Sequence, residues 1–500
     1  MSRDVEASGK GVNVTSSISR SIWFRDAGII KLNFGICFMF ASSASVGYTA
    51  SLINGLLVLP YFTTFTKDFS PELLGLMISA AAIGGFVSFV PGSYMADIFG
   101  RKLCVGLGSA IVVISAVIQA IFTNKWAFIC TRVLAGVGGG VASTAAPLLV
   151  TEVAHPHMRQ TSTALYNSMW YLGSLVSAAV SLFALRIASP WSWRLPCLLQ
   201  TVFPLLQLAG LFFIPESPRW LVANNQKMEA LNTLTKCHAN GVSGDNIVQR
   251  EFEQMCESIL QQQNTAKQGW KTFFSSRGHI HILAICILIG FMGEWAGNGI
   301  MSYYLAPILS SVGIREPLHQ AGVNLSIQVW NLLIASMGSF ASEKYGRRPL
   351  WLSATVLMLL FLTIITLLTG LYEEQGVSPA GIATVPFLFL FYAAYDLGYT
   401  PMFIAYPAEI LPFKLRAKGM AITLLSDSVA AFSNQYVNPV AFSSLRWRYY
   451  CVFLGCLTFF FVSIYFFFPE TKGRSLEEVS GIFNIEDSSE PRGEEDARNH

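Results

Sequence analysis

Long apolar runs separated by short polar stretches dominate the chain. A helix needs about 20 mostly apolar residues to cross a bilayer, and the 500-residue sequence holds twelve runs of about that length. They cover 32–60, 73–95, 103–122, 126–149, 162–184, 195–214, 280–309, 320–341, 350–370, 384–408, 419–441 and 449–468. The pattern predicts an all-α integral membrane protein with twelve transmembrane helices.

A polar stretch after the sixth run divides the runs six and six. Most of the 33 Lys and Arg residues lie on one side of the membrane if the N-terminus is cytosolic, as the positive-inside rule requires. We therefore expect both termini in the cytosol. The predicted parts are a cytosolic N-terminal segment (1–31), an N-terminal six-helix bundle (32–214), a cytosolic loop with short helices (215–279), a C-terminal six-helix bundle (280–468) and a cytosolic C-terminal tail (469–500).

Two charged signatures occur once in each half. D-I-F-G-R-K (97–102) is matched by E-K-Y-G-R-R (343–348), and T-E-V-A-H-P-H-M-R (151–159) by A-E-I-L-P-F-K-L-R (408–416). This duplication predicts two pseudo-symmetric bundles. Transporters use such repeats to rock one half against the other around a central site.

The composition excludes several protein classes. Hydrophobic residues make up 53% of the chain and charged residues 13%, whereas soluble domains carry roughly 25% charged residues. The net charge of +3 gives no reason to expect a nucleic-acid partner. The nine cysteines are scattered without metal-site spacing or a disulfide framework. No nucleotide-binding loop or nucleophile–base pair is visible, so we expect no enzyme, no metal and no cofactor.

Seven motifs in order resemble the sugar porter family of the major facilitator superfamily, from about Gly47 to Glu478. They are G-Y-T-A-S-L-I-N-G (47–55), D-I-F-G-R-K, R-V-L-A-G-V-G-G-G (132–140), P-E-S-P-R-W-L (215–221), E-K-Y-G-R-R-P, P-A-E-I-L-P-F-K-L-R-A-K-G (407–419) and P-E-T-K-G-R-S-L-E-E (469–478). Two further stretches, 294–305 and 433–439, look closest to the fungal lactose-permease and hexose transporters. The resemblance implies the major facilitator fold and a secondary transporter that moves a sugar or other polyhydroxylated solute by alternating access.

The resemblance also implies a substrate site. Sugar porters bind hydroxyls with amides and carboxylates from helices 1, 5, 7, 8, 10 and 11, and such groups offer each hydroxyl a donor or an acceptor. The matching positions are Thr49, Asn54, Asn167, Glu294, Asn298, Asn331, Asp396, Asn434 and Asn438. Each asparagine could instead join two helices by a hydrogen bond. Tyr303, Tyr304 and Phe391 could stack on a sugar ring or only fill space.

The charged signatures predict a cytosolic gate. Acids and arginines at helix ends can pair across the two halves while the cytosolic side is shut, and an exposed pair contributes only ~0–1 kcal/mol, so a network is needed. The predicted set is Asp97, Arg101, Glu152, Arg159, Glu216 and Arg219, with Glu343, Arg347, Glu409, Arg416, Glu470 and Arg474 as its repeat. The alternative is that these residues serve only topology and helix capping.

Several positions depart from the family pattern. Thr49 stands where proton-coupled members carry an acid that pairs with the arginine matching Arg132, and threonine cannot titrate, which favours facilitated diffusion at that site. Two other acids, Glu294 and Asp396, lie within apolar runs, where an ionisable group is a functional candidate. Arg132, Glu294 and Asp396 are therefore the candidates for proton coupling.

Other departures concern the pocket and the tenth helix. Ile404 replaces a family tryptophan and Gly299 a family asparagine, which weakens the case for a standard hexose pocket. Gly398 and Pro401 predict a break in the tenth helix, because proline removes a backbone hydrogen bond and clashes with the preceding turn.

Two rival functions stay open. The altered pocket could serve a weak acid or a specialised metabolite, with the protein acting as an exporter. A nutrient sensor built on the same fold would need a long signalling tail, and only about 30 residues follow the last run. The expected partners are a small solute and the lipid bilayer, with protons in the coupled case, for a monomer in the cell membrane.

Overall fold

The computed structural model describes residues 27–155, 158–239, 246–265, 270–303, 305–411, 415–472 and 482–483. The regular elements in these residues are all helices. The first half contains α1 (Ala27–Met39), α2 (Ala41–Leu56), α3 (Pro60–Phe65), α4 (Pro71–Phe99), α5 (Arg101–Ile121), α6 (Lys125–Val153), α7 (Arg159–Ala184), α8 (Trp191–Leu199) and α9 (Val202–Gly210).

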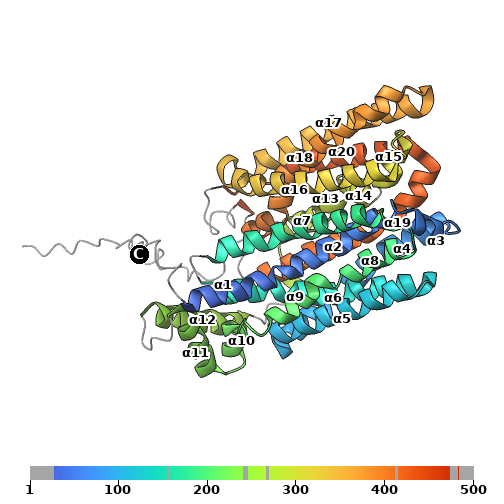
Figure 1. The fold of residues 1–500 in the computed structure, drawn as a ribbon. Coiled ribbons are helices and arrows are strands. Elements are labelled where there is room, and N and C mark those ends of the chain that lie inside the picture. Colours follow the sequence, from blue (N-terminus) through green and yellow to red (C-terminus); the bar gives the residue numbers. More distant parts are fainter. Residues whose placement is uncertain are drawn as a thin grey trace, which may run out of the picture.

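Short helices connect the halves: α10 (Pro218–Ala223), α11 (Lys227–His238), α12 (Asn246–Thr265) and η2 (Trp270–Phe274). The second half contains α13 (Arg277–Trp295), α14 (Asn298–Tyr303), α15 (Leu305–Ser311), α16 (Pro317–Tyr345), α17 (Arg347–Gln375), α18 (Ser378–Ile410), α19 (Arg416–Leu445), η3 (Arg446–Tyr449) and α20 (Tyr450–Phe467). In Figure 1 the long helices run side by side, with α10–α12 at one end and α3 at the other. We call these the loop end and the α3 end.

The twelve predicted spans correspond to these helices when broken ones are joined. The pair α1–α2 forms the first span, α8–α9 the sixth and α13–α15 the seventh, and each other span is one helix. Eight continuous stretches are long and apolar enough to cross a membrane, and one of them, 418–467, includes both α19 and α20. The predicted spans outside these stretches are α7, α8–α9 and α16. Two of them, α7 and α16, carry polar residues toward the centre of the bundle, as described below.

Each half is held together by close helix packing. In the first half α4 and α5 pack on α6, and α2 packs on α7; in the second half α17 packs on α18, and α13 on α19. A Cβ at Gly47 of α2 would overlap the carbonyl oxygen of Trp170 on α7, so this contact needs glycine. Small residues bring helices close where lipid offers no hydrophobic driving force between them.

The two halves meet along two helix pairs, α4 with α19 and α7 with α16. At the α3 end, Val58 forms a buried cluster with Ala306 and Ala321 of the other half. A Cβ at Gly75 of α4 would lie 2.5 Å from the carbonyl oxygen of Tyr436 on α19. These contacts across the halves lie at the α3 end, and a further set lies at mid-height.

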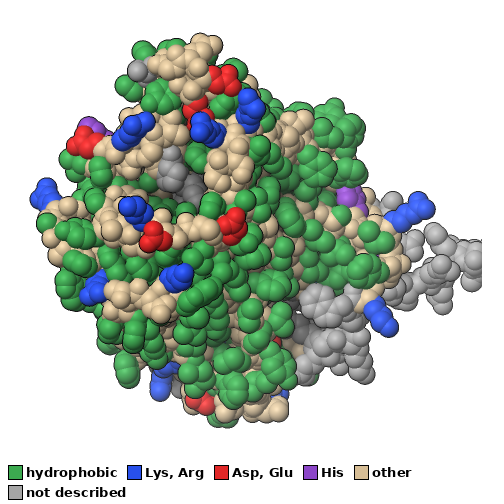
Figure 2. Space-filling view, turned by 90° about the vertical axis from the view of Figure 1, so that its right-hand side faces the viewer, with side chains coloured by type: hydrophobic (Ala, Val, Ile, Leu, Met, Phe, Trp, Pro, Cys, Tyr) green, Lys and Arg blue, Asp and Glu red, His purple; other side chains and the backbone are tan. Residues whose placement is uncertain are grey.

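Large apolar side chains are exposed along the outer helices. Val90 on α4, Ile114 on α5, Leu367 on α17 and Phe466 on α20 are each more than half exposed. Figure 2, which faces the α3 end, shows acidic and basic side chains together on part of that face and hydrophobic side chains over much of the rest. An apolar surface of this extent fits lipid rather than water as its surroundings.

The predicted break in the tenth span is wrong, and the seventh span breaks instead. Helix α18 continues through Gly398 and Pro401 as a single helix. Gly398 serves a close contact, because a Cβ there would overlap Ala354 of α17. The chain leaves the helical path at Gly297, whose φ is +99°, between α13 and α14.

Candidate functional site

A hydrogen-bonded cluster joins the two halves near the middle of the long helices. The hydroxyl of Tyr171, on α7, donates to Asp396 Oδ1, on α18, at 2.5 Å. Thr400 Oγ1 donates to the same oxygen at 2.9 Å and lies 3.2 Å from the Tyr171 hydroxyl. With its amide nitrogen turned toward the cluster, Asn331 of α16 donates to Asp396 Oδ2 at 3.3 Å.

This cluster gives a buried carboxyl three polar neighbours. Asp396 is 0% exposed, and a buried polar group without partners is costly, so the neighbours offset that cost. The same donors and acceptors suit the hydroxyls of a polyol. Asn331 and Asp396 belong to the predicted site, whereas Tyr171 and Thr400 do not. Tyr171 follows the predicted Asn167 by one helical turn, a spacing that could have identified it.

A broken helix places a second acid near mid-height. Glu294 lies in the last turn of α13, just before the break at Gly297. Its Oε2 atom has no hydrogen-bond partner among the described residues, and its carboxyl interacts electrostatically with that of Asp427 on α19. A Cβ at Gly293 would lie 2.8 Å from Asp427 Oδ1, so the acid lies against α13. Discontinuous helices form substrate sites in many transporters. Asp427 was not among the predicted site residues.

The predicted asparagines of α19 are fully buried within the second half. Asn438 Nδ2 donates to Asn434 Oδ1 at 2.8 Å, and the Tyr449 hydroxyl donates to Asn438 Oδ1 at 2.8 Å. Asn434 Nδ2 donates to the backbone oxygen of Glu294 at 3.3 Å. A Cβ at Gly299 would overlap Asn434 Oδ1. The glycine at position 299 thus leaves the space that Asn434 fills.

Asn54 joins the halves closer to the α3 end. Its Nδ2 donates to Asn324 Oδ1, on α16, at 3.2 Å, and Gln328 Nε2 lies 3.5 Å from the same oxygen. All three side chains are buried. This arrangement matches the alternative that the amide joins two helices, and here those helices belong to different halves.

The remaining predicted residues lie in different surroundings. Thr49 Oγ1 accepts from Gln200 Nε2 and donates to the Ser45 carbonyl oxygen, both at 2.8 Å. Arg132 is only 3% exposed on α6 and interacts with the thiol of Cys197. Asn167 is exposed and Asn298 half-buried.

The predicted aromatic residues differ in what the structure describes. Phe391 is buried beside Gly297, where a Cβ would lie 3.2 Å from its ring. The side chains of Tyr303 and Tyr304 lie outside the described residues.

The charged signature of the first half forms a network at the loop end. Arg101 Nε donates to Glu152 Oε2 at 3.2 Å, and its Nη2 lies 3.4 Å from Asp97 Oδ1. The Ser217 hydroxyl also donates to Glu152. Gly100, with φ +96°, separates α4 from α5 and lets Glu216 approach the start of α5.

Glu216 caps the start of α5. Its carboxylate accepts the backbone N–H of Arg101 at 3.1 Å and of Lys102 at 3.2 Å. A carboxylate is favourable at a helix N-terminus, where backbone N–H groups are unpaired. Burial nevertheless outweighs these bonds and raises the pKa of Glu216 above its ordinary value.

The second half repeats this geometry. Arg347 binds Glu409 with Nη2–Oε1 at 2.7 Å and Nε–Oε1 at 3.1 Å. Glu470 accepts the backbone N–H groups of Arg347 and Arg348 at 3.0 Å, and Gly346 takes the same unusual φ, +92°. Burial acts to raise the pKa of Glu470, but its backbone hydrogen bonds outweigh burial, so this pKa lies below its ordinary value.

The ion pairs that we describe in these networks each join helices of one half. Arg219 lies on α10 outside these hydrogen bonds. The side chains of Arg159, Glu343, Arg416 and Arg474 lie outside the described residues. Pairing across the two halves therefore stays a prediction.

Known proteins similar to this chain are transporters. A sequence model of the family described as "Sugar (and other) transporter" matches residues 34–483. Hexose transporter 2 of Kluyveromyces lactis is 28% identical over 420 residues, which cover 82% of this chain and 73% of that protein. Hexose transporter HXT11 of Saccharomyces cerevisiae is 26% identical over 468 residues, which cover 90% and 82%.

Solved structures confirm the fold. The major facilitator superfamily proton:xylose symporter XylE, solved with 6-bromo-6-deoxy-D-glucose, matches with a TM-score of 0.73 and 21% identity over 91% of this chain and 99% of that chain. An inward-open form of XylE from E. coli also matches with a TM-score of 0.73, over 89% and 98%. The predicted major facilitator fold, with twelve transmembrane helices in two pseudo-symmetric bundles, is confirmed. Because the family model spans most of its length, the chain belongs to the sugar (and other) transporter family.

Proposed function

We propose that this protein moves a sugar or other polyhydroxylated small solute across a membrane by alternating access. The observation that carries the proposal is the hydrogen bond between Tyr171 and Asp396, which joins the two halves near mid-height. A solute that binds there contacts both halves at once. Its affinity can therefore differ between the two states of the protein, as a transport cycle requires.

The substrate site of this proposal is built around Asp396 and Asn331, with Tyr171 and Thr400 as additional ligands. Their hydroxyl, amide and carboxyl groups can exchange hydrogen bonds with one another for hydrogen bonds with the solute. Glu294, Asn298 and Asn167 are the further predicted ligands, from the seventh and fifth spans. Thr49, Asn54, Asn434 and Asn438 already bond to protein groups and shape the site's surroundings.

The charged networks are proposed to control opening at the loop end. Each network fixes the ends of consecutive helices through one arginine and two acids, Arg101 with Glu152 and Glu216, and Arg347 with Glu409 and Glu470. Their duplication supports a shared task in the two halves. We further propose that the loop end faces the cytosol, that both termini lie there, and that the protein works as a monomer in the cell membrane.

Facilitated diffusion is our proposal for the coupling mode. Thr49 is engaged with Gln200 and Ser45, so no acid stands there to exchange a proton with Arg132. If transport proves to be proton-coupled, Glu294 and Asp396 are the acids that could take up the proton, with Arg132 as the third candidate. A sugar cargo is favoured over a weak acid or specialised metabolite because the relatives are named hexose transporters.

Uptake into transporter-deficient cells tests the proposal. Labelled hexoses, disaccharides and polyols are supplied with and without a protonophore. Uptake that saturates and is competed by other sugars supports the function, and insensitivity to the protonophore supports facilitated diffusion. If no sugar is taken up while the protein is present in the membrane, the sugar cargo is wrong.

A further inference from the structure

A cavity of about 530 Å³ lies at the α3 end, away from the central cluster. Its walls come only from the second half, and its lining residues are Ser310, Ser311, Arg315, Tyr372, Glu373, Gly376, Phe442, Ser443 and Arg446. Ligand pockets commonly enclose about 300–1,000 Å³. The cavity therefore has the size of a ligand site, and the proposed transport cycle does not use it.

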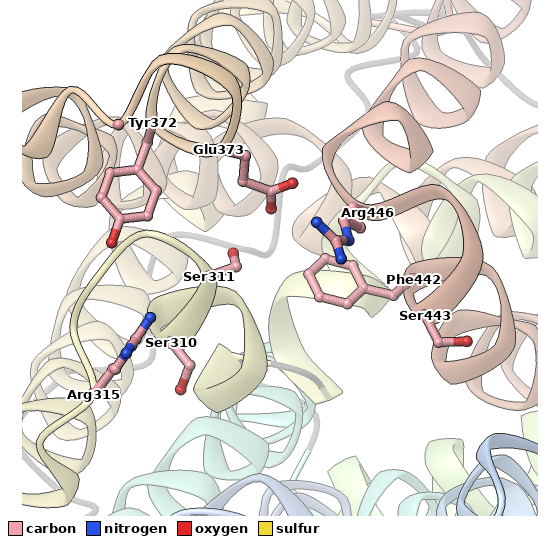
Figure 3. A pocket seen from close by; sticks show the side chains of 9 residues that line it. Ser310, Ser311, Arg315, Tyr372, Glu373, Phe442, Ser443 and Arg446 are labelled. Carbon is pink, nitrogen blue, oxygen red and sulfur yellow. The ribbon is translucent and has the colours of Figure 1, made fainter.

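The charges in the cavity restrict its ligand. In Figure 3, Arg315 and Arg446 stand on different sides of the cavity, with Glu373 between them. The carboxylate of Glu373 repels an anion, and the two guanidinium groups repel a simple cation. These opposed charges favour an uncharged ligand that both donates and accepts hydrogen bonds.

The remaining lining supplies hydroxyl groups and an aromatic ring. Ser310, Ser311, Ser443 and Tyr372 contribute hydroxyls, and the ring of Phe442 borders the cavity. Hydroxyl groups can both donate and accept, and a ring offers an apolar surface to the C–H face of a sugar. Such a lining fits a carbohydrate better than a purely apolar molecule.

Two features show that this lining is under strain or unsatisfied. Arg446 has φ +50° although it is not glycine, a conformation that is uncommon and often marks a functional position. Glu373 Oε2 is buried without a hydrogen-bond partner among the described residues. A buried polar atom of this kind calls for a donor, and a ligand hydroxyl would provide one.

We propose that this cavity is a second carbohydrate-binding site, which takes an uncharged polyhydroxylated solute at the α3 end. Glu373 accepts from the ligand's hydroxyls, Arg315 and Arg446 donate to them, and Phe442 packs on the ring. The site goes beyond the proposed transport site, with which it shares no residue.

Helix α15 links this site to the interface between the halves. Ser310 and Ser311 line the cavity, whereas Ala306 of the same helix packs against Val58 of the first half. Occupancy of the cavity therefore bears on the contact that holds the α3 end together.

The test measures equilibrium binding of labelled D-glucose and maltose to the full chain in lipid nanodiscs. An Asn331→Ala/Asp396→Asn background removes the central site, so the remaining binding reports the cavity. We expect saturable binding in this background, weakened at least tenfold by Glu373→Gln or by Arg446→Gly. The glycine also relieves the positive φ, so the second variant does not depend on a strained fold.

Matched controls lie beside the two residues. Glu374 and Arg448 pair with each other at 3.7 Å on the surface and do not line the cavity, so Glu374→Gln and Arg448→Ala should leave binding unchanged. Absence of binding in the background, or binding that ignores both cavity variants, overturns the proposal. Stronger competition by inorganic phosphate or by an amino acid than by sugars overturns the ligand class.

The proposal and the transport function can fail separately. If the wild-type protein transports sugar but the background binds none, the cavity proposal falls and transport stands. If the wild-type protein transports no sugar while binding remains sensitive to Glu373→Gln, the transport proposal falls and the cavity stands.

Discussion

Tyr171 and Asp396 come from different halves of the chain, 225 positions apart, and share a hydrogen bond of 2.5 Å. The bond lies near the middle of α7 and of α18. Any relative motion of the halves around this point must stretch or replace it. The pair therefore couples substrate binding to the motion that transport requires.

Replacing Tyr171 by Phe should lower sugar transport at low concentration at least tenfold, and Asp396→Asn should have a similar effect. A hydrogen bond to a charged group contributes about 1.5–3 kcal/mol, and 1.4 kcal/mol corresponds to a factor of ten. Initial uptake rates over a range of sugar concentrations measure the change. Tyr48→Phe is the control, because Tyr48 donates to Pro196 within one half. Equal activity of Tyr171→Phe and the wild type would remove this pair from the site.

Arg347→Lys should slow transport although it keeps the charge. Arg347 grips Glu409 through two nitrogens, and lysine cannot reproduce this fork. We expect the maximal rate to fall severalfold, in Arg347→Ala and Arg101→Ala as well. Counterflow in proteoliposomes measures the rate, and Arg277→Ala, at an exposed position near the same end, is the control. Normal transport by the two alanine variants would contradict the gate.

The acids that cap α5 and α17 should respond differently to pH. The lowered pKa of Glu470 means that its charge stabilises the folded state above pH 4.5, its ordinary pKa, and that this stabilisation is lost as pH falls through the lower, folded value. The raised pKa of Glu216 means that its charged form is disfavoured in the folded state, a cost that disappears as pH falls through the folded value.

At pH 7, Glu470→Gln should therefore lower the unfolding temperature, and Glu216→Gln should leave it unchanged or raise it. The difference between the variants should shrink as the pH falls below about 4.5. Thermal unfolding in detergent across this range is the measurement. A Glu216→Gln variant that is the less stable of the two at pH 7 would reverse the assignment.

Gly299→Ala should destabilise the protein by about 1–3 kcal/mol, the usual cost of overpacking. Its new Cβ would overlap Asn434 Oδ1. The second change Asn434→Ala should recover part of this loss, because it removes the clashing group. Unfolding temperatures of the single and double variants test the coupling. Gly322→Ala is the control, since a Cβ there meets nothing within 4 Å; purely additive effects would show that the two positions do not clash.

The sequence predicted the helices better than their interruptions. Apolar length and repeated charges identified all the spans, because lipid imposes a minimum length on a helix. The break was predicted at Gly398 and Pro401, yet α18 is continuous and Gly297 interrupts the seventh span. A bundle tolerates proline inside a helix, so proline alone does not locate a break.

The site could be predicted only in part, for a similar reason. Asn331 and Asp396 were recognised by residue type and family position. Tyr171 and Asp427 were not, because a tyrosine on a helix resembles packing and because contact between helices 225 positions apart leaves no local pattern. For Asn434 and Asn438, sequence could not separate substrate contact from the internal bonds that the structure shows.

The arginine networks of the two halves have one further consequence. Arg101 and Arg347 each bond to acids of their own half, so these bonds can persist while the halves tilt. Each half then behaves as a preassembled unit whose tertiary structure does not depend on a covalent link to the other. Two separately synthesised polypeptides, one for each half, should associate in a membrane into a complete transporter.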